Sequence, residues 1–215
     1  MAKLIIAAND KDTISRYRFG LKDERIIEIL LRYITRTRNI DVYPPAYIGY
    51  LGFKAWSTIE ELVSEFILTQ VVFRNTSGRR ARHEIVSFWG DEVYDMNGVN
   101  RLVEIAYAFA QWYYLQGFQV AFAIHLDSGH PHIHFVINTV NFMTGKKYHC
   151  NRFALEQQKR YLQNIIENLT GRSKFHVQVN NYMESEEEID PTVFLHQRRL
   201  NAVSFAYEGE RKIVY

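Results

Sequence analysis

The sequence predicts an α+β domain with a central, mainly antiparallel sheet and helices packed on it. Segments typical of strands are separated by long segments typical of helices. One stretch, "AIHLDSGHPHIHFVIN" (residues 123–138), has the pattern of two strands joined by a tight turn. A chain of 215 residues is long enough for one sizeable domain with a buried core. We therefore expect residues 1–215 to form a single domain.

The expected strands are short apolar or alternating segments, and the expected helices are longer segments with helix signals. The strands are expected at residues 3–8, 83–88, 118–127, 131–141 and 174–179. The helices are expected at residues 23–38, from residue 57 onward, at 97–116 and at 153–169. A final hairpin is expected to turn at Glu208–Gly209, after the acidic run at residues 184–190.

Local signals set the bounds of several of these elements. Residues 23–38 begin with acidic residues and end with arginine, which matches the helix dipole. Thr58, preceded by Ser57, begins a sequence typical of a capped helix start, and Gly117 ends the helix at residues 97–116. Pro44 and Pro45 exclude a helix interior, so residues 43–53 are expected to be a loop or an irregular extended segment.

Composition sets the class of protein but not its function. Hydrophobic residues make up 47% and charged residues 23%, as in ordinary soluble domains, and the formal charge is only +2. The single cysteine, Cys150, excludes an intrachain disulfide framework and fits a reducing compartment. The N-terminus is too short and too soon charged for a signal peptide, and no apolar run approaches the length that crosses a membrane. We expect a cytoplasmic protein without a membrane partner.

Histidines are concentrated in the hairpin. Because side chains alternate along a strand, His125 and Asp127 share one face, and His132 and His134 share one face of the next strand. If Gly129–His130 forms the tip, Asp127 lies opposite His132, and His125 opposite His134. The other face is then apolar, with Ile124, Ile133, Phe135 and Ile137.

Three imidazoles on one patch predict a site for a divalent metal ion. Neutral imidazole suits Zn, Mn, Co or Ni, and three protein ligands leave positions open for substrate or water. Asp127 is expected to hold a ligand histidine in one tautomer, while His130 belongs to the turn. The alternative is a polar sheet face whose histidines make ordinary hydrogen bonds.

The pattern H-x-D-x-x-H-P-H-x-H-x-V-x-N resembles the third motif of conjugative relaxases, which are HUH endonucleases. Here it consists of His125, Asp127, His130, Pro131, His132, His134, Val136 and Asn138. The likeness is greatest to the P-type mobilisation relaxases, the class that includes the endonuclease of T-DNA borders, and covers about residues 24–150. It implies a palm-type fold, a divalent ion held by His125, His132 and His134, and a tyrosine that becomes joined to the 5′ end of one DNA strand. Mg²⁺ or Mn²⁺ is expected, with Zn²⁺, Co²⁺ or Ni²⁺ as alternatives.

The family's first motif nominates Tyr33 as the nucleophile. "LLRYITRTRN" resembles its "Y-[IL]-[ST]-R" pattern. At about 100° per residue, Tyr33 lies between an apolar stripe and a basic face with Arg25, Arg32 and Arg36. The alternative is an ordinary boundary tyrosine. Further candidate nucleophiles lie in the following loop, at Tyr43, Tyr47 and Tyr50.

The second motif and two basic segments supply candidate DNA contacts. "RHEIVSFWG" resembles the family's second motif, which assigns Ser87 to the DNA near the scissile phosphate, with His83 and Phe88 as further matches. Arginine and lysine contacts to single-stranded DNA are expected from Arg32, Arg36, Arg79, Arg80, Arg82, Lys146 and Lys147. The alternative for each basic segment is a solvated loop. Some relatives carry an acidic residue where this chain has Gly129, and Asp127 is expected to take over its role.

The resemblance implies a relaxase that nicks one strand at a transfer origin. Its expected partners are single-stranded or extruded transfer-origin DNA, relaxosome accessory proteins and a type IV coupling protein. One alternative is an HUH replication initiator or single-strand transposase, although those tend to carry the tyrosine after the histidine motif. The other is a metal-containing DNA-binding module without catalysis.

Overall fold

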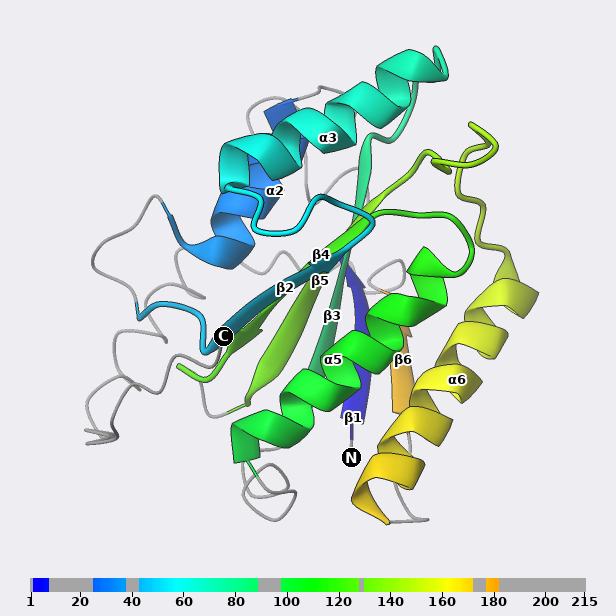
Figure 1. Cartoon of the computed structure of the whole chain (residues 1–215). Coiled ribbons are helices and arrows are strands. Elements are labelled where there is room, and N and C mark those ends of the chain that lie inside the picture. Colours follow the sequence, from blue (N-terminus) through cyan, green and yellow to red (C-terminus); the bar gives the residue numbers. More distant parts are fainter. Residues whose placement is uncertain are drawn as a thin grey trace, which may run out of the picture.

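The computed structural model describes residues 2–7, 25–37, 43–88, 98–127, 130–171 and 177–181. The strands are β1 (Ala2–Ala7), β2 (Tyr47–Leu51), β3 (Ala81–Phe88), β4 (Val120–His125), β5 (His132–Asn138) and β6 (Val177–Asn181). The helices are α2 (Arg25–Thr35), α3 (Ile59–Val72), α5 (Gly98–Tyr114) and α6 (Arg152–Thr170). Figure 1 shows their arrangement. The expected hairpin at Glu208–Gly209 and the acidic run lie outside the described residues.

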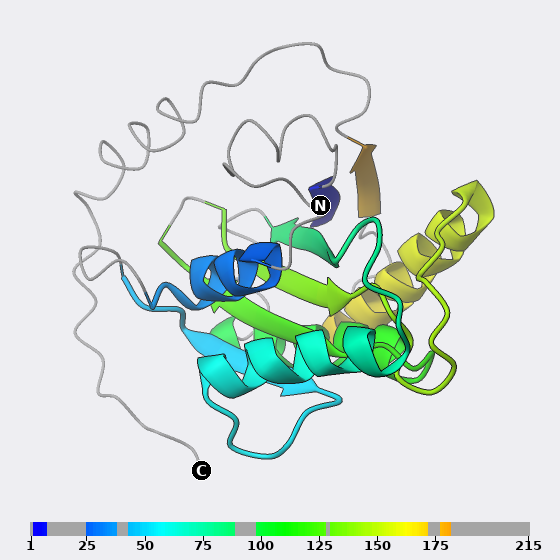
Figure 2. The same ribbon diagram turned by 90° about the horizontal axis from the view of Figure 1, so that it is seen from above.

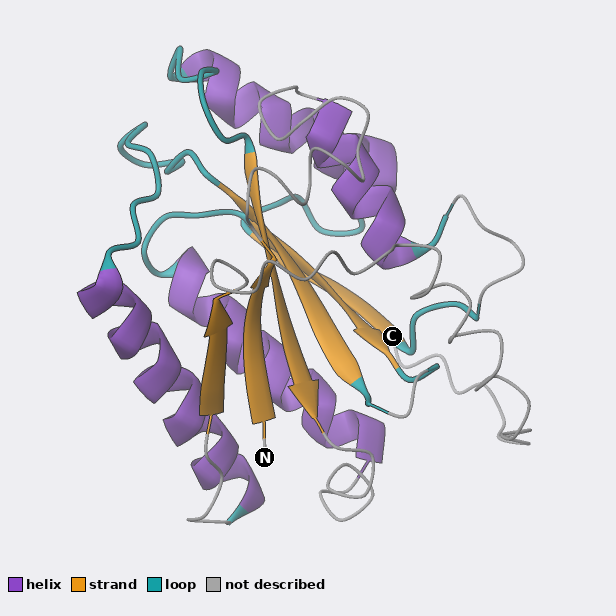
Figure 3. Cartoon of the chain, turned by 180° about the vertical axis from the view of Figure 1, so that it is seen from behind, coloured by secondary structure: helices purple, strands orange, loops and turns teal. Residues whose placement is uncertain are grey.

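The strands form one sheet in the order β2-β4-β5-β3-β1-β6. Every neighbouring pair is antiparallel except β1 and β6, which are parallel. Figure 3 shows the sheet from the side away from α5, with helices flanking it. The prediction of an α+β fold with a mainly antiparallel sheet is therefore confirmed.

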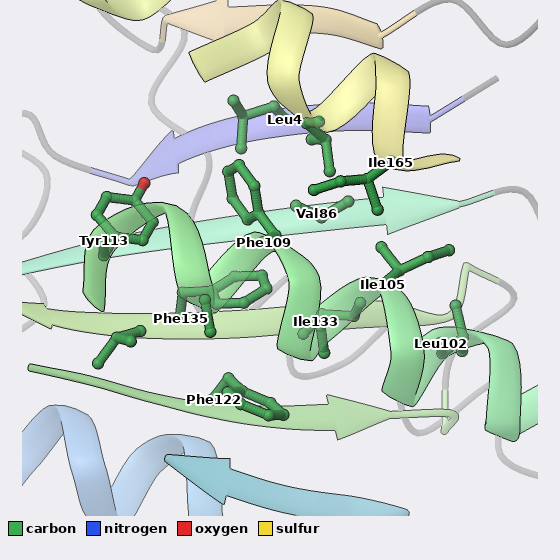
Figure 4. Close-up of a cluster of buried hydrophobic side chains, with 14 of the residues drawn as sticks. Leu4, Val86, Leu102, Ile105, Phe109, Tyr113, Phe122, Ile133, Phe135 and Ile165 are labelled. Atoms are coloured by element: carbon green, nitrogen blue, oxygen red, sulfur yellow. The ribbon is translucent and has the colours of Figure 1, made fainter. Parts of the chain in front are cut away.

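Helices cover both faces of the sheet. Helices α5 and α6 pack on one face, around Phe109, Phe122 and Phe135 (Figure 4). Helices α2 and α3 lie side by side on the other face (Figures 1 and 2), which we call the α2 face. The two faces differ in side-chain size. Strands β4 and β5 present large apolar residues to α5, whereas β4 presents Ala121 and Ala123 to α2, which lets α2 approach closely. The predicted apolar set of Ile124, Ile133, Phe135 and Ile137 is buried in the α5 core, as expected.

The hairpin register differs from the prediction by two residues. His125 pairs with His132, and Ala123 pairs with His134, so the prediction that Asp127 lies opposite His132 was wrong. Strand β4 ends at His125 and β5 begins at His132, so the connection from Leu126 to Pro131 is longer than a tight turn. A slip of one residue would have moved the histidines to the other face, but a shift of two keeps them on the α2 face.

Two further boundaries differ from the sequence prediction. Residues 47–51 form strand β2, which pairs with β4, where an irregular segment was expected. Helix α2 ends at Thr35, because Arg36 adopts a left-handed backbone conformation with φ of 57°. The start of α3 is as predicted, since Thr58 and Glu61 form a reciprocal capping box. None of the described helices has an apolar stretch long enough to cross a bilayer.

Candidate metal centre

Three histidines meet on the α2 face, where β4 ends and β5 begins. His125, His132 and His134 are all buried, and one ring nitrogen from each lies within 4.8 Å of the others. The ring centroids are 4.6 to 5.2 Å apart. The sequence therefore predicted correctly that these three imidazoles share one patch.

A fourth histidine, His83 on β3, joins the cluster. Its Nε2 lies 2.9 Å from Nδ1 of His134, and the two rings stack with centroids 5.1 Å apart. Burial, with a smaller effect of the charge on His132, lowers the pKa of His83 to about 4, so its ring is neutral at physiological pH. The sequence matched His83 to a motif without giving it a role. Its alternation along β3 was visible, but the pairing of β3 with β5 was not.

Hydrogen bonds to backbone carbonyls set the tautomers of two ligand candidates. Nδ1 of His132 lies 3.0 Å from the carbonyl oxygen of His130, and a carbonyl can only accept, so this nitrogen carries the proton. The Nε2 atom of His132 is then the one with a lone pair. For His125 the assignment is reversed, because its Nε2 lies 2.7 Å from the carbonyl oxygen of Ile34. Burial lowers the pKa of His125 to about 3, which keeps it neutral.

Arg36 links the cluster to Asp127. Its Nη2 lies 3.0 Å from Nδ1 of His125 and donates to Oδ1 of Asp127 at 2.7 Å. The side chains of Arg36 and Asp127 are only 6% and 10% exposed, so this is a largely buried ion pair. Asp127 was predicted to bond a ligand histidine. The structure shows it bound to the guanidinium that contacts His125.

Tyr33 lies over the histidines from α2. Its ring meets those of His134 and His83 edge to face, with centroids 5.5 and 6.0 Å apart, and the residue is 39% exposed. The other candidate nucleophiles are held elsewhere or are more exposed. The hydroxyl of Tyr47 bonds that of Tyr107 on the α5 face, the hydroxyl of Tyr50 accepts from the backbone of Ser57, and Tyr43 is 65% exposed.

Two more candidates for DNA contacts are Arg32 on α2 and Ser87 on β3, and their surroundings differ. Ser87 pairs with His132 across β3 and β5, so its side chain is on the histidine face. Arg32 instead forms ion pairs with Glu28 on its own helix and with Glu60 on α3. The basic face predicted for α2 is thus divided, because the helix ends before Arg36.

The remaining basic candidates lie near the other end of β3 and β5. Arg79, Arg82 and Lys147 line one cavity there. Arg80 is buried and donates to the carbonyl oxygen of Thr76, while Lys146 is exposed.

Asn138, the last residue of the histidine motif, is distant from the cluster and has a structural role. It is fully buried. Its amide nitrogen donates to the carbonyl oxygen of Phe66 and to Gln119, and its amide oxygen accepts from Gln70 and from the backbone of Val140. These bonds join α3 to the sheet.

The residues present fit a divalent metal ion. Three buried imidazoles converge, and His134 has a hydrogen-bond partner in His83, as ligand histidines of metal sites usually have. The ring nitrogen of His125 that has the lone pair is the one that faces Arg36, so an ion at this atom would meet the guanidinium.

Parts of this chain match known proteins. Residues 47–170 match the family described as "Relaxase: MobA/VirD2-like, nuclease domain". Protein rlx of Staphylococcus aureus is 33% identical over 97 residues, which are 45% of this chain and 28% of that protein. A solved structure reported as "Molecular Basis of Vancomycin Resistance Transfer in Staphylococcus aureus" has a TM-score of 0.46 at 14% identity, over 64% of this chain and 77% of that one.

The match to the family covers more than half of the 215 residues and includes β2 to α6, and with them all four histidines of the cluster. It begins after α2, so Tyr33 and Arg36 lie outside it. The 97 residues aligned with Protein rlx span little more than a quarter of that protein's length. On the extent of the family match, the chain belongs to the MobA/VirD2-like relaxases and contains their nuclease domain.

Proposed function

We propose that this chain nicks one DNA strand at a transfer origin by attack of Tyr33 on the scissile phosphate. The observation that carries the proposal is the position of Tyr33, whose partly exposed ring contacts His134 in the histidine cluster that fits a metal ion. A nucleophile must lie beside the group that stabilises the phosphate, and no other candidate tyrosine of the loop has a described contact with these histidines.

The proposed reaction exchanges one phosphodiester for another. The phenol oxygen of Tyr33 forms a bond to phosphorus while the bond from phosphorus to the 3′ oxygen breaks. The phenol proton is lost, the 3′ oxygen takes up a proton, and the 5′ phosphate remains on the tyrosine. A divalent ion, when bound, polarises the non-bridging oxygens and offsets the charge of the transition state.

The protein's own residues have distinct parts in this proposal. The histidines hold the ion, and His83 keeps His134 in the tautomer that can bind it. Arg36, the nearest described cation to His125, is positioned to interact with the phosphate charge. Ser87 is on the same face and is proposed to contact DNA close to the scissile bond.

The wider setting is part of the same proposal. We infer that the substrate is single-stranded or extruded transfer-origin DNA, and that the chain acts in the cytoplasm with relaxosome accessory proteins and a type IV coupling protein. Mg²⁺ or Mn²⁺ is the proposed ion. Residues 1–215 are proposed to form one nuclease domain, which in the cell is part of a longer relaxase.

Tyr33→Phe tests the mechanism because it removes one oxygen and keeps the ring that packs on His134. Wild-type protein with labelled single-stranded DNA and Mn²⁺ should form an adduct that survives denaturation. Tyr33→Phe should bind Mn²⁺ and DNA normally but form neither adduct nor nick, whereas Tyr43→Phe should behave as wild type. Normal nicking by Tyr33→Phe would refute the assignment.

A further inference from the structure

A polar cavity lies near the opposite end of β3 and β5 from the histidines, with a volume of about 520 Å³. It is lined by Ser77, Gly78, Arg79, Arg82, Thr139, Lys147, Tyr148, His149 and Cys150. Thr139 is five residues from His134, roughly 16 Å along the segment at the rise of a strand. Arg82 pairs with Ile137 of the core under α5, so its side chain is on the opposite face of the sheet from the histidines. Ser77, Gly78 and His149 are exposed at its rim.

The lining of the cavity is strongly basic. Three cationic side chains, those of Arg79, Arg82 and Lys147, come from two segments far apart in the sequence, and the lining includes no aspartate or glutamate. Lys147 is held in place, since its Nζ donates to the carbonyl oxygen of Arg79 at 2.9 Å and to Oγ1 of Thr139 at 3.2 Å. Burial, and the charge of Arg80, lower the pKa of Lys147 to about 8, so an anion in the cavity would stabilise its charged form.

Arg82 carries a side-chain donor that has no partner among the described residues. Its side chain is 7% exposed, and its Nε is paired with the fully buried carboxylate of Glu84. Its guanidinium lies over the ring of Tyr148, with Cζ 5.2 Å from the ring centroid. Its Nη2 is buried and has no hydrogen-bond partner among the described residues. Glu84 is itself held by Tyr113 and Gln158, so the guanidinium is fixed at the wall of the cavity.

We propose that this cavity binds a backbone phosphate of the DNA strand, at a distance from the bond that is cut. This rests on the proposed function, which supplies the strand. A phosphate would accept hydrogen bonds from fixed cationic donors, and the volume leaves room for the sugar of the same nucleotide. The site would hold the strand in register while Tyr33 acts on another phosphate.

Lys147→Gln tests the proposal with little risk to the fold, because glutamine can still donate to Oγ1 of Thr139. Arg82 is less suitable, since its removal would leave the buried carboxylate of Glu84 without its cation. The matched comparison is Lys146→Gln, which makes the same change of charge at the exposed neighbouring residue outside the cavity. Melting curves check that both variants are folded.

Binding is measured in EDTA with a single strand that the wild-type protein nicks, with flanks of ten or more nucleotides on either side of the cut. Lys147→Gln should weaken DNA binding roughly threefold to tenfold. The negative slope of log K against log salt should become smaller in magnitude by about 0.7, the value for one phosphate contact on a single strand. Lys146→Gln should change the DNA affinity and the salt slope by less. Equal losses in the two variants would show a general effect of charge and refute the cavity as a site.

Further measurements distinguish a DNA backbone phosphate from free phosphate as the bound group. They also distinguish failure of this proposal from failure of the proposed function. If the effect of Lys147→Gln disappears on a strand trimmed to the nucleotides around the nick, the bound group is a remote backbone phosphate. If inorganic phosphate binds in a Lys147-dependent way while DNA affinity is unchanged, the site takes free phosphate and the DNA assignment is wrong. Adduct formation by the wild-type protein at saturating DNA tests the proposed function by itself. Failure of wild type to form the adduct would refute the proposed function instead.

Discussion

Nε2 of His83 lies 2.9 Å from Nδ1 of His134, with both rings buried. Only one of these nitrogens can carry the shared proton. If His134 donates, its Nε2 has the lone pair that a metal ion needs, whereas the reverse arrangement puts a proton there. The low pKa of His83 keeps it neutral and able to accept. His83 is therefore positioned to select the metal-binding tautomer of His134.

Replacement of His83 should weaken metal binding without removing a ligand. We expect His83→Ala to lower Mn²⁺ affinity about 10- to 100-fold, the usual cost of losing a partner of a ligand histidine. His83→Gln should lose less, because its amide oxygen can accept from His134. Calorimetric titration measures both, with Ser87→Ala as a control on the same strand face. An unchanged affinity in His83→Ala would show that His134 needs no partner.

We expect the positive charge of Arg36 to weaken the binding of a metal ion at His125. Its guanidinium is 3.0 Å from the lone-pair nitrogen of that ring, so removal of its charge should favour a cation there. We predict that Arg36→Gln binds Mn²⁺ more tightly than wild type but forms the DNA adduct more slowly. Arg32→Gln removes an equal charge from the ion pairs with Glu28 and Glu60 and should leave Mn²⁺ affinity unchanged. Weaker Mn²⁺ binding by Arg36→Gln would contradict this reading.

His132 and His130 give a matched pair for the ligand assignment. His132 is buried in the cluster, whereas His130 is exposed and contributes its carbonyl oxygen to the cluster. His132→Ala should lose at least about tenfold in Mn²⁺ affinity, and His130→Ala should retain most of it, because alanine preserves the carbonyl. Equal losses, measured by the same titration, would mean that the turn supplies a ligand.

Asn138 should matter for stability and not for metal binding. Asn138→Ala removes the four buried hydrogen bonds that the amide makes with Gln70, Gln119 and the backbone of Phe66 and Val140, at about 0.5–1.5 kcal/mol each. Urea unfolding should show a loss of roughly 2–5 kcal/mol. Asn75→Ala, which removes one half-buried bond to the carbonyl oxygen of Gly145, should cost less. At temperatures where Asn138→Ala is folded, its Mn²⁺ affinity should equal that of wild type.

The metal-free protein should lose stability in mild acid. The pKa values of His83 and His125 are about 4 and about 3 in the folded chain, against roughly 6.5 when unfolded. Between these values the unfolded chain binds more protons, so the free energy of unfolding falls as pH decreases from about 6.5 towards 4. Each histidine contributes at most about 1.4 kcal/mol per pH unit.

Urea titrations in EDTA between pH 7.5 and 4.5 measure this dependence. His83→Gln should give a shallower curve than wild type, since one of the two groups is gone. A wild-type curve that is flat across this range would show that the two rings take up protons as easily in the folded state as in the unfolded state.

The sequence alone determined the α+β class, most of the elements and the faces of the strands. These features depend on local patterns, since alternation at a period of two places His132 and His134 on one side whatever the partner strand. The capping box at Thr58 and the helix end before Gly117 are local in the same sense. A pattern confined to one segment can be interpreted without knowing which other segments lie beside it in the fold.

The tertiary structure decided which segments meet. Loop length set the hairpin register, and the pairing of β3 with β5 brought His83 to His134. The left-handed turn at Arg36 directed its guanidinium to His125. The packing of α2 on alanines of β4 placed Tyr33 over the cluster. Each depends on contacts between residues far apart in the chain, whose energies come from packing and hydrogen bonds that no local periodicity encodes.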